Sequence, residues 1–239
     1  GKTTTLYSLL NLMSTPENKV ITLEDPVEYP IVGVTQSQID EKHDYNFSSG
    51  LRAVLRHDPN IVMLGEIRDL ETAQTSAQAA LTGHVVLSTL HTNSAIETIP
   101  RLINMGLPAF MIAPALDTII AQRLVRKACS KCATMEAISD SEKKEFEVIA
   151  VVEVPSKVPK VHGCSFCSNT GYKGRLVVCE VITMTSEIKD LILNNASLVD
   201  LIAAARKEGI MTMREDGFLK VAQGLTTLEE VYRVTNISA

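Results

Sequence analysis

Residues 58–69 read DPNIVMLGEIRD, and this stretch decides the fold. Its centre, residues 61–64, is a short apolar run that Pro and Asn precede and Gly and Glu follow. Similar runs occur at 20–23 (VITL) and 85–87 (VVL), and helix-like sequence separates each run from the next. Short branched runs of this kind are typical of buried parallel strands. The sequence therefore predicts an α/β fold built on a parallel sheet.

Each of the three runs ends in polar residues. Glu24, Asp25 and Glu28 follow the first run, Glu66 follows the second, and His91 follows the third. In open parallel sheets the ligand crevice lies beyond the carboxyl ends of the strands. One such ending can be explained by the polarity of loops, but three endings favour a single site.

The first residues, GKTTTLYSLL (1–10), supply the phosphate end of that site. Gly1, Lys2 and Thr3 match the last three positions of G-x-x-x-x-G-K-[ST], and helical spacing follows over residues 2–13. Backbone N–H groups near Gly1 and the Lys2 ammonium would hold phosphate oxygens, and the Thr3 hydroxyl would bind Mg²⁺. Hydrolysis of a bound triphosphate also needs a group that positions or deprotonates the attacking water, and Glu66 would do this. His91 would contact the terminal phosphate, or it is only a hydrogen-bonded loop histidine.

The composition sets limits on the class of protein. The chain has 239 residues, 45% of them hydrophobic and 21% charged, with a formal net charge of −5. These values are ordinary for a globular protein and give no reason to expect a nucleic-acid surface. The sequence contains neither a membrane-spanning apolar stretch nor a signal-peptide pattern. A cytoplasmic protein is predicted, with membrane association only through partners.

Four cysteines form a second motif. Cys129 and Cys132 make one C-x2-C pair, and Cys164 and Cys167 make another. Two such pairs present four thiolates to Zn²⁺, whereas two disulfides are the competing interpretation, less favoured in the cytoplasm. The fifth, Cys179, lies in an apolar run and is predicted to be a buried thiol.

Three long segments resemble the type II secretion and type IV pilus ATPases, a family of hexameric RecA-like motors. ITLEDPVEY (21–29) is similar to the acidic box, LRAVLRHDPNIVMLGEIRDLETA (51–73) to the Walker B segment, and TGHVVLSTLHTNSA (82–95) to the histidine box. Residues 205–235 also resemble the end of family members, so the resemblance covers essentially the whole chain.

The resemblance implies roles for individual residues. Glu66 matches the catalytic glutamate, with Gly65 before it where many other P-loop proteins carry aspartate. His84 and His91 match the two histidines of the histidine box. The implied nucleotide and magnesium residues are Gly1, Lys2, Thr3, Thr4, Asp25 and Glu28.

Two pairs of charged residues leave alternatives open. Arg52 and Arg56 lie one helical turn apart and share a face. That face is either simply solvated, or, as the resemblance implies, it approaches phosphates or the site of a neighbouring subunit. Arg68 and Asp69 could form a structural ion pair, and no catalytic role is assigned to them.

The predicted organisation has three segments. Residues 1–126 form an ATPase core that lacks its first strand and most of its phosphate loop, residues 127–178 a zinc subdomain, and residues 179–239 a helical subdomain. The chain is therefore expected to be a fragment with negligible ATP hydrolysis of its own. Three capping patterns predict helix starts at Ser197, Thr212 and Thr227.

The predicted function is that of an ATP-hydrolysing hexameric motor for type II secretion or type IV pilus assembly. The tetracysteine motif weighs against a retraction motor, because retraction members generally lack it. The expected partners are further copies of the chain and an inner-membrane platform protein, without nucleic acid. The alternatives are a zinc-stabilised assembly subunit that does not hydrolyse ATP, and a motor of the same fold that acts on DNA.

Overall fold

The computed structural model describes residues 1–149 and 151–235, and these residues group into two compact units. Unit 1 comprises Gly1–Ile119 and Ile182–Lys207. Unit 2 comprises Ile120–Val181 and the chain from Glu208 onward. The three-segment division predicted from the sequence stays a prediction.

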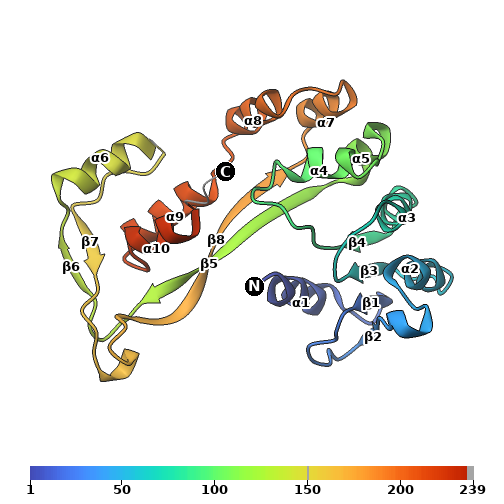
Figure 1. The fold of residues 1–239 in the computed structure, drawn as a ribbon, viewed down its shortest axis with the longest axis horizontal. Helices are drawn as coiled ribbons and strands as arrows, with labels where there is room; N and C mark the ends of the chain where they lie inside the picture. Colours follow the sequence, from blue (N-terminus) through green and yellow to red (C-terminus); the bar gives the residue numbers. More distant parts are fainter. Residues whose placement is uncertain (150, 236–239) are drawn as a thin grey trace. The chain divides into compact units, whose positions relative to one another are not determined.

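Unit 1 is built on a four-stranded parallel sheet with the order β2-β1-β3-β4 (Figure 1). The three predicted strands are confirmed as β1 (Val20–Glu24), β3 (Ile61–Leu64) and β4 (Val85–Leu87). A fourth strand, β2 (Val34–Gln38), was not predicted, and it pairs with β1 from Val20↔Val34 to Glu24↔Gln38. Because all four strands run in parallel, the loops after β1, β3 and β4 meet at one edge of the sheet.

The two faces of this sheet carry different apolar clusters. On one face, Tyr7 and Leu10 of α1 (Lys2–Met13) pack with Val20, Ile61 and Met63. The alternate strand residues point to the other face. There Ile21, Leu23, Val62 and Leu64 pack with Phe47, Leu51 and Val54 of α2 (Phe47–Leu55). Burial on both faces explains why these strands read as continuous apolar runs.

Further helices complete unit 1. Asn46 begins α2 with a capping box that it shares with Ser49, and Asp69 caps α3 (Leu70–Leu81) by accepting from the Thr72 N–H. The remaining helices of the unit are η1 (Glu41–His43), α4 (Thr98–Asn104), α5 (Ala109–Ala115), α7 (Ser186–Leu193) and α8 (Leu198–Lys207).

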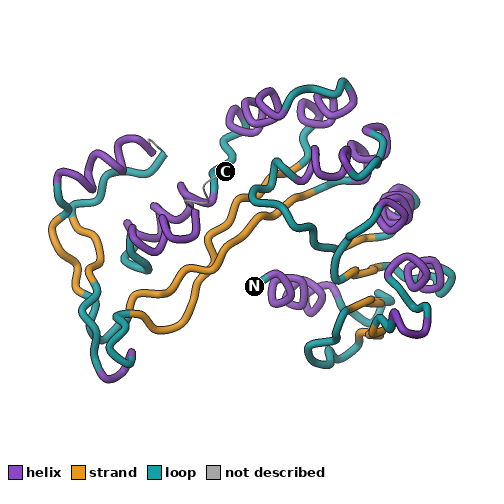
Figure 2. Tube along the Cα trace, viewed as in Figure 1, coloured by secondary structure: helices purple, strands orange, loops and turns teal. Residues whose placement is uncertain are grey.

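Unit 2 has two small sheets and its own core. The long strands β5 (Thr118–Ala128) and β8 (Tyr172–Thr183) form one sheet, and their residues up to Ile119 and from Ile182 are assigned to unit 1. Figure 2 shows the second, β6 (Thr134–Ala137) beside β7 (Lys157–Lys160), which are antiparallel. Phe146 of α6 (Asp140–Ile149) packs edge-to-face on Phe218 of α9 (Met213–Ala222). The other elements are η2 (Ser165–Cys167) and α10 (Leu228–Thr235).

The predicted helix starts agree with the structure. Ser197 and Asp200 bond reciprocally before α8, and Thr212 and Glu215 form a capping box on α9. At Thr227 the hydroxyl accepts from the Glu230 N–H, but the Glu230 carboxylate turns to two arginines instead. No helix in the described part of the chain is long and apolar enough to cross a bilayer.

Candidate nucleotide site and tetracysteine cluster

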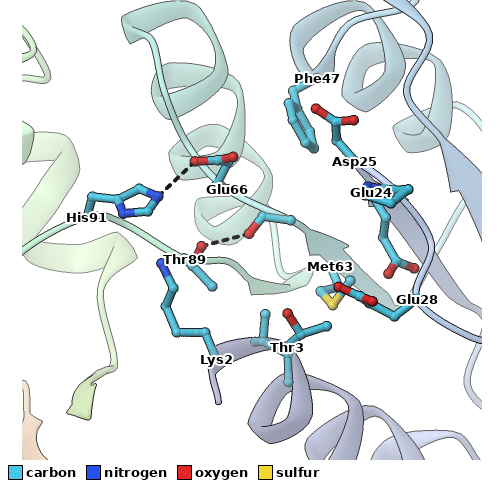
Figure 3. Close-up of a pocket in the computed structure, with 13 residues that line it drawn as sticks. Lys2, Thr3, Glu24, Asp25, Glu28, Phe47, Met63, Glu66, Thr89 and His91 are labelled. Carbon is cyan, nitrogen blue, oxygen red and sulfur yellow. Dashed lines mark hydrogen bonds and ion pairs between the residues drawn. The ribbon is translucent and has the colours of Figure 1, made fainter. Parts of the chain in front are cut away.

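A pocket lies at the carboxyl ends of β1, β3 and β4, within unit 1 (Figure 3). It brings together residues that are far apart in the sequence, because each strand delivers its following loop to the same sheet edge. The predicted site residues that line it are Lys2, Thr3, Asp25, Glu28, Glu66 and His91.

Helix α1 presents its amino-terminal end to this pocket. Gly1 is its N-cap, and the Lys2 side chain extends from the helix start beside Thr89 (Figure 3). The first N–H groups of a helix lack intrahelical acceptors, and the helix dipole places partial positive charge there. Together with the Lys2 ammonium, this end of α1 favours an anion such as a phosphate.

Glu66 follows β3 and is held by neighbours on both carboxylate oxygens. Arg68 Nη2 lies 2.5 Å from Oε1, and His91 Nε2 lies 3.1 Å from Oε2. Thr89 donates to the Gly65 carbonyl at 2.7 Å, which ties the end of β4 to the end of β3. The hydrogen bond from Arg68 holds the pKa of Glu66 below its usual value, against a smaller opposing effect of burial. Glu66 is therefore an ionised acceptor.

The acids after β1 approach the pocket from its other side. Asp25 and Glu28 belong to the loop between β1 and β2, and the Asp25–Pro26 peptide is cis. Figure 3 shows Thr3 of α1 close to the Glu28 side of this loop. A hydroxyl and several carboxylates form a set of hard oxygen donors, which is the set that Mg²⁺ prefers. The residues that line the pocket thus fit a magnesium–phosphate group.

Five predicted site residues do not line the pocket. Thr4 is exposed on α1, and its carbonyl accepts from Ser8. Arg52 is half exposed and pairs with Glu71, while Arg56 is the exposed C-cap of α2. His84 bonds the Ala79 carbonyl at 3.0 Å. Gly1 caps α1 as described.

Three residues around the pocket were not predicted from the sequence. Phe47 and Thr89 line it, and Arg68 pairs with Glu66 at 2.5 Å and with Asp25 at 3.7 Å. The suggested pairing of Arg68 with Asp69 is not what the structure shows, because the Asp69 carboxylate instead caps α3. The alternation Glu-Ile-Arg was the available signal, since it places Glu66 and Arg68 on one side of an extended segment.

The four predicted ligand cysteines converge in unit 2. Their sulfurs all lie within 4.8 Å of one another, with Cys129–Cys164 at 3.9 Å, Cys132–Cys167 at 3.8 Å and Cys164–Cys167 at 3.7 Å. These distances exceed an S–S bond of about 2.05 Å, and the thiols are free. Sulfurs placed tetrahedrally about 2.3 Å from zinc would be about 3.8 Å apart. The donor set therefore fits Zn²⁺ better than two disulfides.

Backbone donors support a thiolate at Cys167. Burial alone would raise its pKa, but the N–H groups of Cys164 at 3.2 Å and Gly171 at 3.3 Å point at its sulfur. The pKa of Cys167 is lowered to about 6. His162 lies outside the cluster and bonds Thr134 at 2.8 Å. Cys179 is half-buried, so its predicted full burial is wrong, because it lies on the less covered face of β8.

Solved structures with this fold include a pilus motor and an ATPase. The pilus retraction motor PilT with bound ADP superposes with a TM-score of 0.70 at 28% identity, covering 99% of this chain and 58% of that one. The Legionella pneumophila ATPase DotB gives a TM-score of 0.67 at 25% identity, covering 98% and 56%. The parallel sheet of unit 1 thus belongs to a RecA-like α/β fold.

Sequence relatives define the family more closely. Residues 1–233 match the family described as type II/IV secretion system protein, and the chain belongs to it. The type IV pilus assembly ATPase PilB of Pseudomonas aeruginosa is 45% identical over 98% of this chain and 41% of its own length. The type II secretion system protein E of the same organism is 44% identical, covering 98% and 46%. The chain thus spans less than half the length of these relatives.

Proposed function

We propose that the chain is the motor core of an ATPase that powers type II secretion or type IV pilus assembly. One observation carries this proposal: a single pocket gathers Lys2 and Thr3 from α1 with acids and a histidine from three strand ends. Family membership supplies the reaction class, and the pocket supplies the groups that such a reaction requires.

Each residue has a proposed part in ATP hydrolysis. Lys2 and the N–H groups at the start of α1 hold phosphate oxygens. Thr4, which follows Thr3 on the same helix, is proposed as a further nucleotide-binding residue. Glu66 orients the attacking water or accepts a proton from it. His91, whose Nε2 lies 3.1 Å from Glu66 Oε2, is proposed to contact the terminal phosphate. When bound, Mg²⁺ would neutralise phosphate charge. Its proposed protein ligands are Thr3, Asp25 and Glu28.

Arg52 and Arg56 are proposed to act on a neighbouring subunit. Both are exposed on or just after α2, and neither lines the pocket of its own chain. Arg52 pairs with Glu71 through side chains that are about half exposed, an arrangement that costs little to break. A guanidinium released in this way could stabilise charge at an adjacent site. This role implies a homo-oligomer, which we propose to be a hexamer.

The cellular location, the partners and the bound metal are also proposals. We place the motor on the cytoplasmic side of the inner membrane, where it would act on a platform protein without entering the bilayer or binding nucleic acid. The tetracysteine cluster is proposed to hold Zn²⁺ and to stabilise its part of unit 2. Bound zinc would there replace the S–H groups by four metal–thiolate bonds.

ATP turnover by the full-length protein tests the function. The comparison is between the parent protein and Glu66→Gln, with Glu17→Gln, an exposed glutamate outside the pocket, as the matched control. Loss of the base should lower kcat by about 10²- to 10⁴-fold while ATP still binds. The control should keep full turnover.

Two results would overturn the proposal. Absence of ATP turnover in assembled rings would favour an assembly subunit that only binds nucleotide. Tight, salt-dependent binding to DNA that stimulates turnover would favour a DNA motor.

A further inference from the structure

We infer that Tyr7 is a positioning residue that braces the phosphate-binding helix against the acidic loop. The inference rests on the proposed function and deepens it. Tyr7 lies five positions after Lys2 on α1 and is fully buried. Its hydroxyl donates to Glu24 Oε2 and accepts from the Glu28 N–H at 3.3 Å. One hydroxyl therefore contacts both the end of β1 and the loop that carries the magnesium acids.

Glu24 is the buried anchor of this brace. It is 3% exposed, and its second oxygen accepts from the Thr22 hydroxyl at 2.5 Å and from Gln36 Nε2 at 3.0 Å. A buried carboxylate is stable only when its oxygens are satisfied in this way. Although Glu24 adjoins Asp25 and borders the pocket, its oxygens are engaged by protein donors. We therefore assign it to positioning rather than to magnesium binding.

The loop is held at two further points. Gln36 of β2 accepts from the Ile31 N–H at 2.7 Å and donates to the Tyr29 carbonyl at 3.2 Å. The Tyr29 ring packs edge-to-face on Tyr7, with 4.7 Å between ring centroids. The segment from 25 to 31 is thus fixed to α1 through Tyr7 and to the sheet through Gln36.

This arrangement sets the separation between the pocket residues on α1 and those on the loop after β1. Thr3 belongs to α1, whereas Asp25 and Glu28 belong to the loop, and the Tyr7 hydroxyl links the helix directly to that loop. Mg²⁺ demands nearly ideal octahedral geometry, so small displacements of its ligands weaken binding. Loss of the hydroxyl should therefore weaken the magnesium-dependent part of nucleotide binding and leave contacts to the phosphates alone largely intact.

Tyr7→Phe in the full-length protein tests the brace. The affinity for a non-hydrolysable ATP analogue is measured with excess Mg²⁺ and with EDTA. The readout is the affinity with Mg²⁺ divided by the affinity with EDTA. The ratio should fall about three- to tenfold, as expected for one lost hydrogen bond. Affinity in EDTA should stay within about twofold of the parent, because contacts of Lys2 and the α1 amides to phosphate are unchanged.

Two controls separate the brace from simple destabilisation. Leu10→Val removes packing from the same buried side of α1 without touching a polar group, and Tyr29→Phe keeps the ring contact. Both should leave the affinity ratio unchanged. If affinities with Mg²⁺ and with EDTA fall in parallel in Tyr7→Phe, the residue is only structural and the inference is wrong.

A second variant covers a folding failure. If Tyr7→Phe does not fold, Gln36→Leu removes the donor to Glu24 and Tyr29 on a half-buried strand, and it should lower the same ratio. An unchanged ratio there overturns the brace. Binding is measured without hydrolysis, so a protein that shows the effect but never turns over ATP would contradict the proposed function alone.

Discussion

Arg68 Nη2 lies 2.5 Å from Oε1 of Glu66, two residues earlier in the chain. This ion pair stabilises the ionised carboxylate and lowers its pKa. Arg68→Ala should therefore raise the pKa of Glu66 towards its ordinary value. If Glu66 is the base, the acid limb of the pH dependence of kcat/KM for ATP will move to higher pH. Steady-state turnover between pH 4 and 8 measures this shift.

The control for Arg68→Ala is Arg175→Ala, which removes an exposed arginine of unit 2 and should leave the limb in place. An acid limb that stays at the same pH in Arg68→Ala would show that a group other than Glu66 governs it.

The strands of unit 1 were predictable where burial on both faces leaves a continuous apolar run. β2 was not, because VTQSQ carries a single apolar residue and its side chains are only partly buried. It is a strand because its backbone pairs with β1 at the sheet edge, and such pairing is a tertiary interaction. The strand propensity of these residues therefore does not predict the pairing of β2 with β1.

The pocket was predictable because the carboxyl ends of parallel strands lie at one end of the sheet, which places Asp25, Glu66 and His91 together. The hydrogen-bond partners of the side chains were not predictable. They depend on where each side chain points and how far away its neighbours lie, and not on the spacing of residues in the sequence. Tyr7 lies within a helical apolar pattern and reads as core, yet its hydroxyl reaches Glu24 seventeen residues away. The predicted inactivity of this chain alone, the roles of the site residues and the zinc ion stay predictions.

Cys167→Ser should release the proposed zinc ion. The variant removes a thiolate that two backbone N–H groups stabilise, and a serine hydroxyl is a much poorer zinc ligand. Elemental analysis should fall from about one zinc per chain to well below one, with a lower Tm. Cys179→Ser, outside the cluster, should keep its metal. A parent protein that contains no zinc, or contains iron instead, would contradict the assignment.

Glu230 should make the stability of the protein depend on acid pH. It is fully buried, and although burial would raise its pKa, hydrogen bonds from Arg233 and Arg126 outweigh this and lower the pKa from 4.5 to about 2. Because the folded pKa is depressed, the stabilisation is complete above about pH 4.5 and is lost as the pH falls towards 2. The shift corresponds to on the order of 3 kcal/mol.

Denaturant unfolding of the parent and of Glu230→Gln between pH 2.5 and 7 checks this expectation. Glu230→Gln should be less stable at pH 7, and the difference should shrink as the pH falls. Glu229→Gln, one residue earlier in the same helix, is the matched control. A difference that stays constant with pH would mean that the arginine pairs contribute no net stabilisation.

Gly217 should resist replacement by alanine, although alanine is the better helix former by about 1 kcal/mol. A Cβ at this position of α9 would lie 2.5 Å from Val231 Cγ1 of α10, and Val231 is fully buried with Phe218 and Val221 around it. Since the valine cannot move aside, overpacking of about 1–3 kcal/mol should exceed the gain in propensity. Gly217→Ala is therefore expected to lower the free energy of unfolding, measured by denaturant titration.

Val231→Ala opens space at the same contact, so the double variant should be more stable than the sum of the two single changes predicts. Strict additivity would show that the two helices separate freely and that the contact between α9 and α10 does not limit this position.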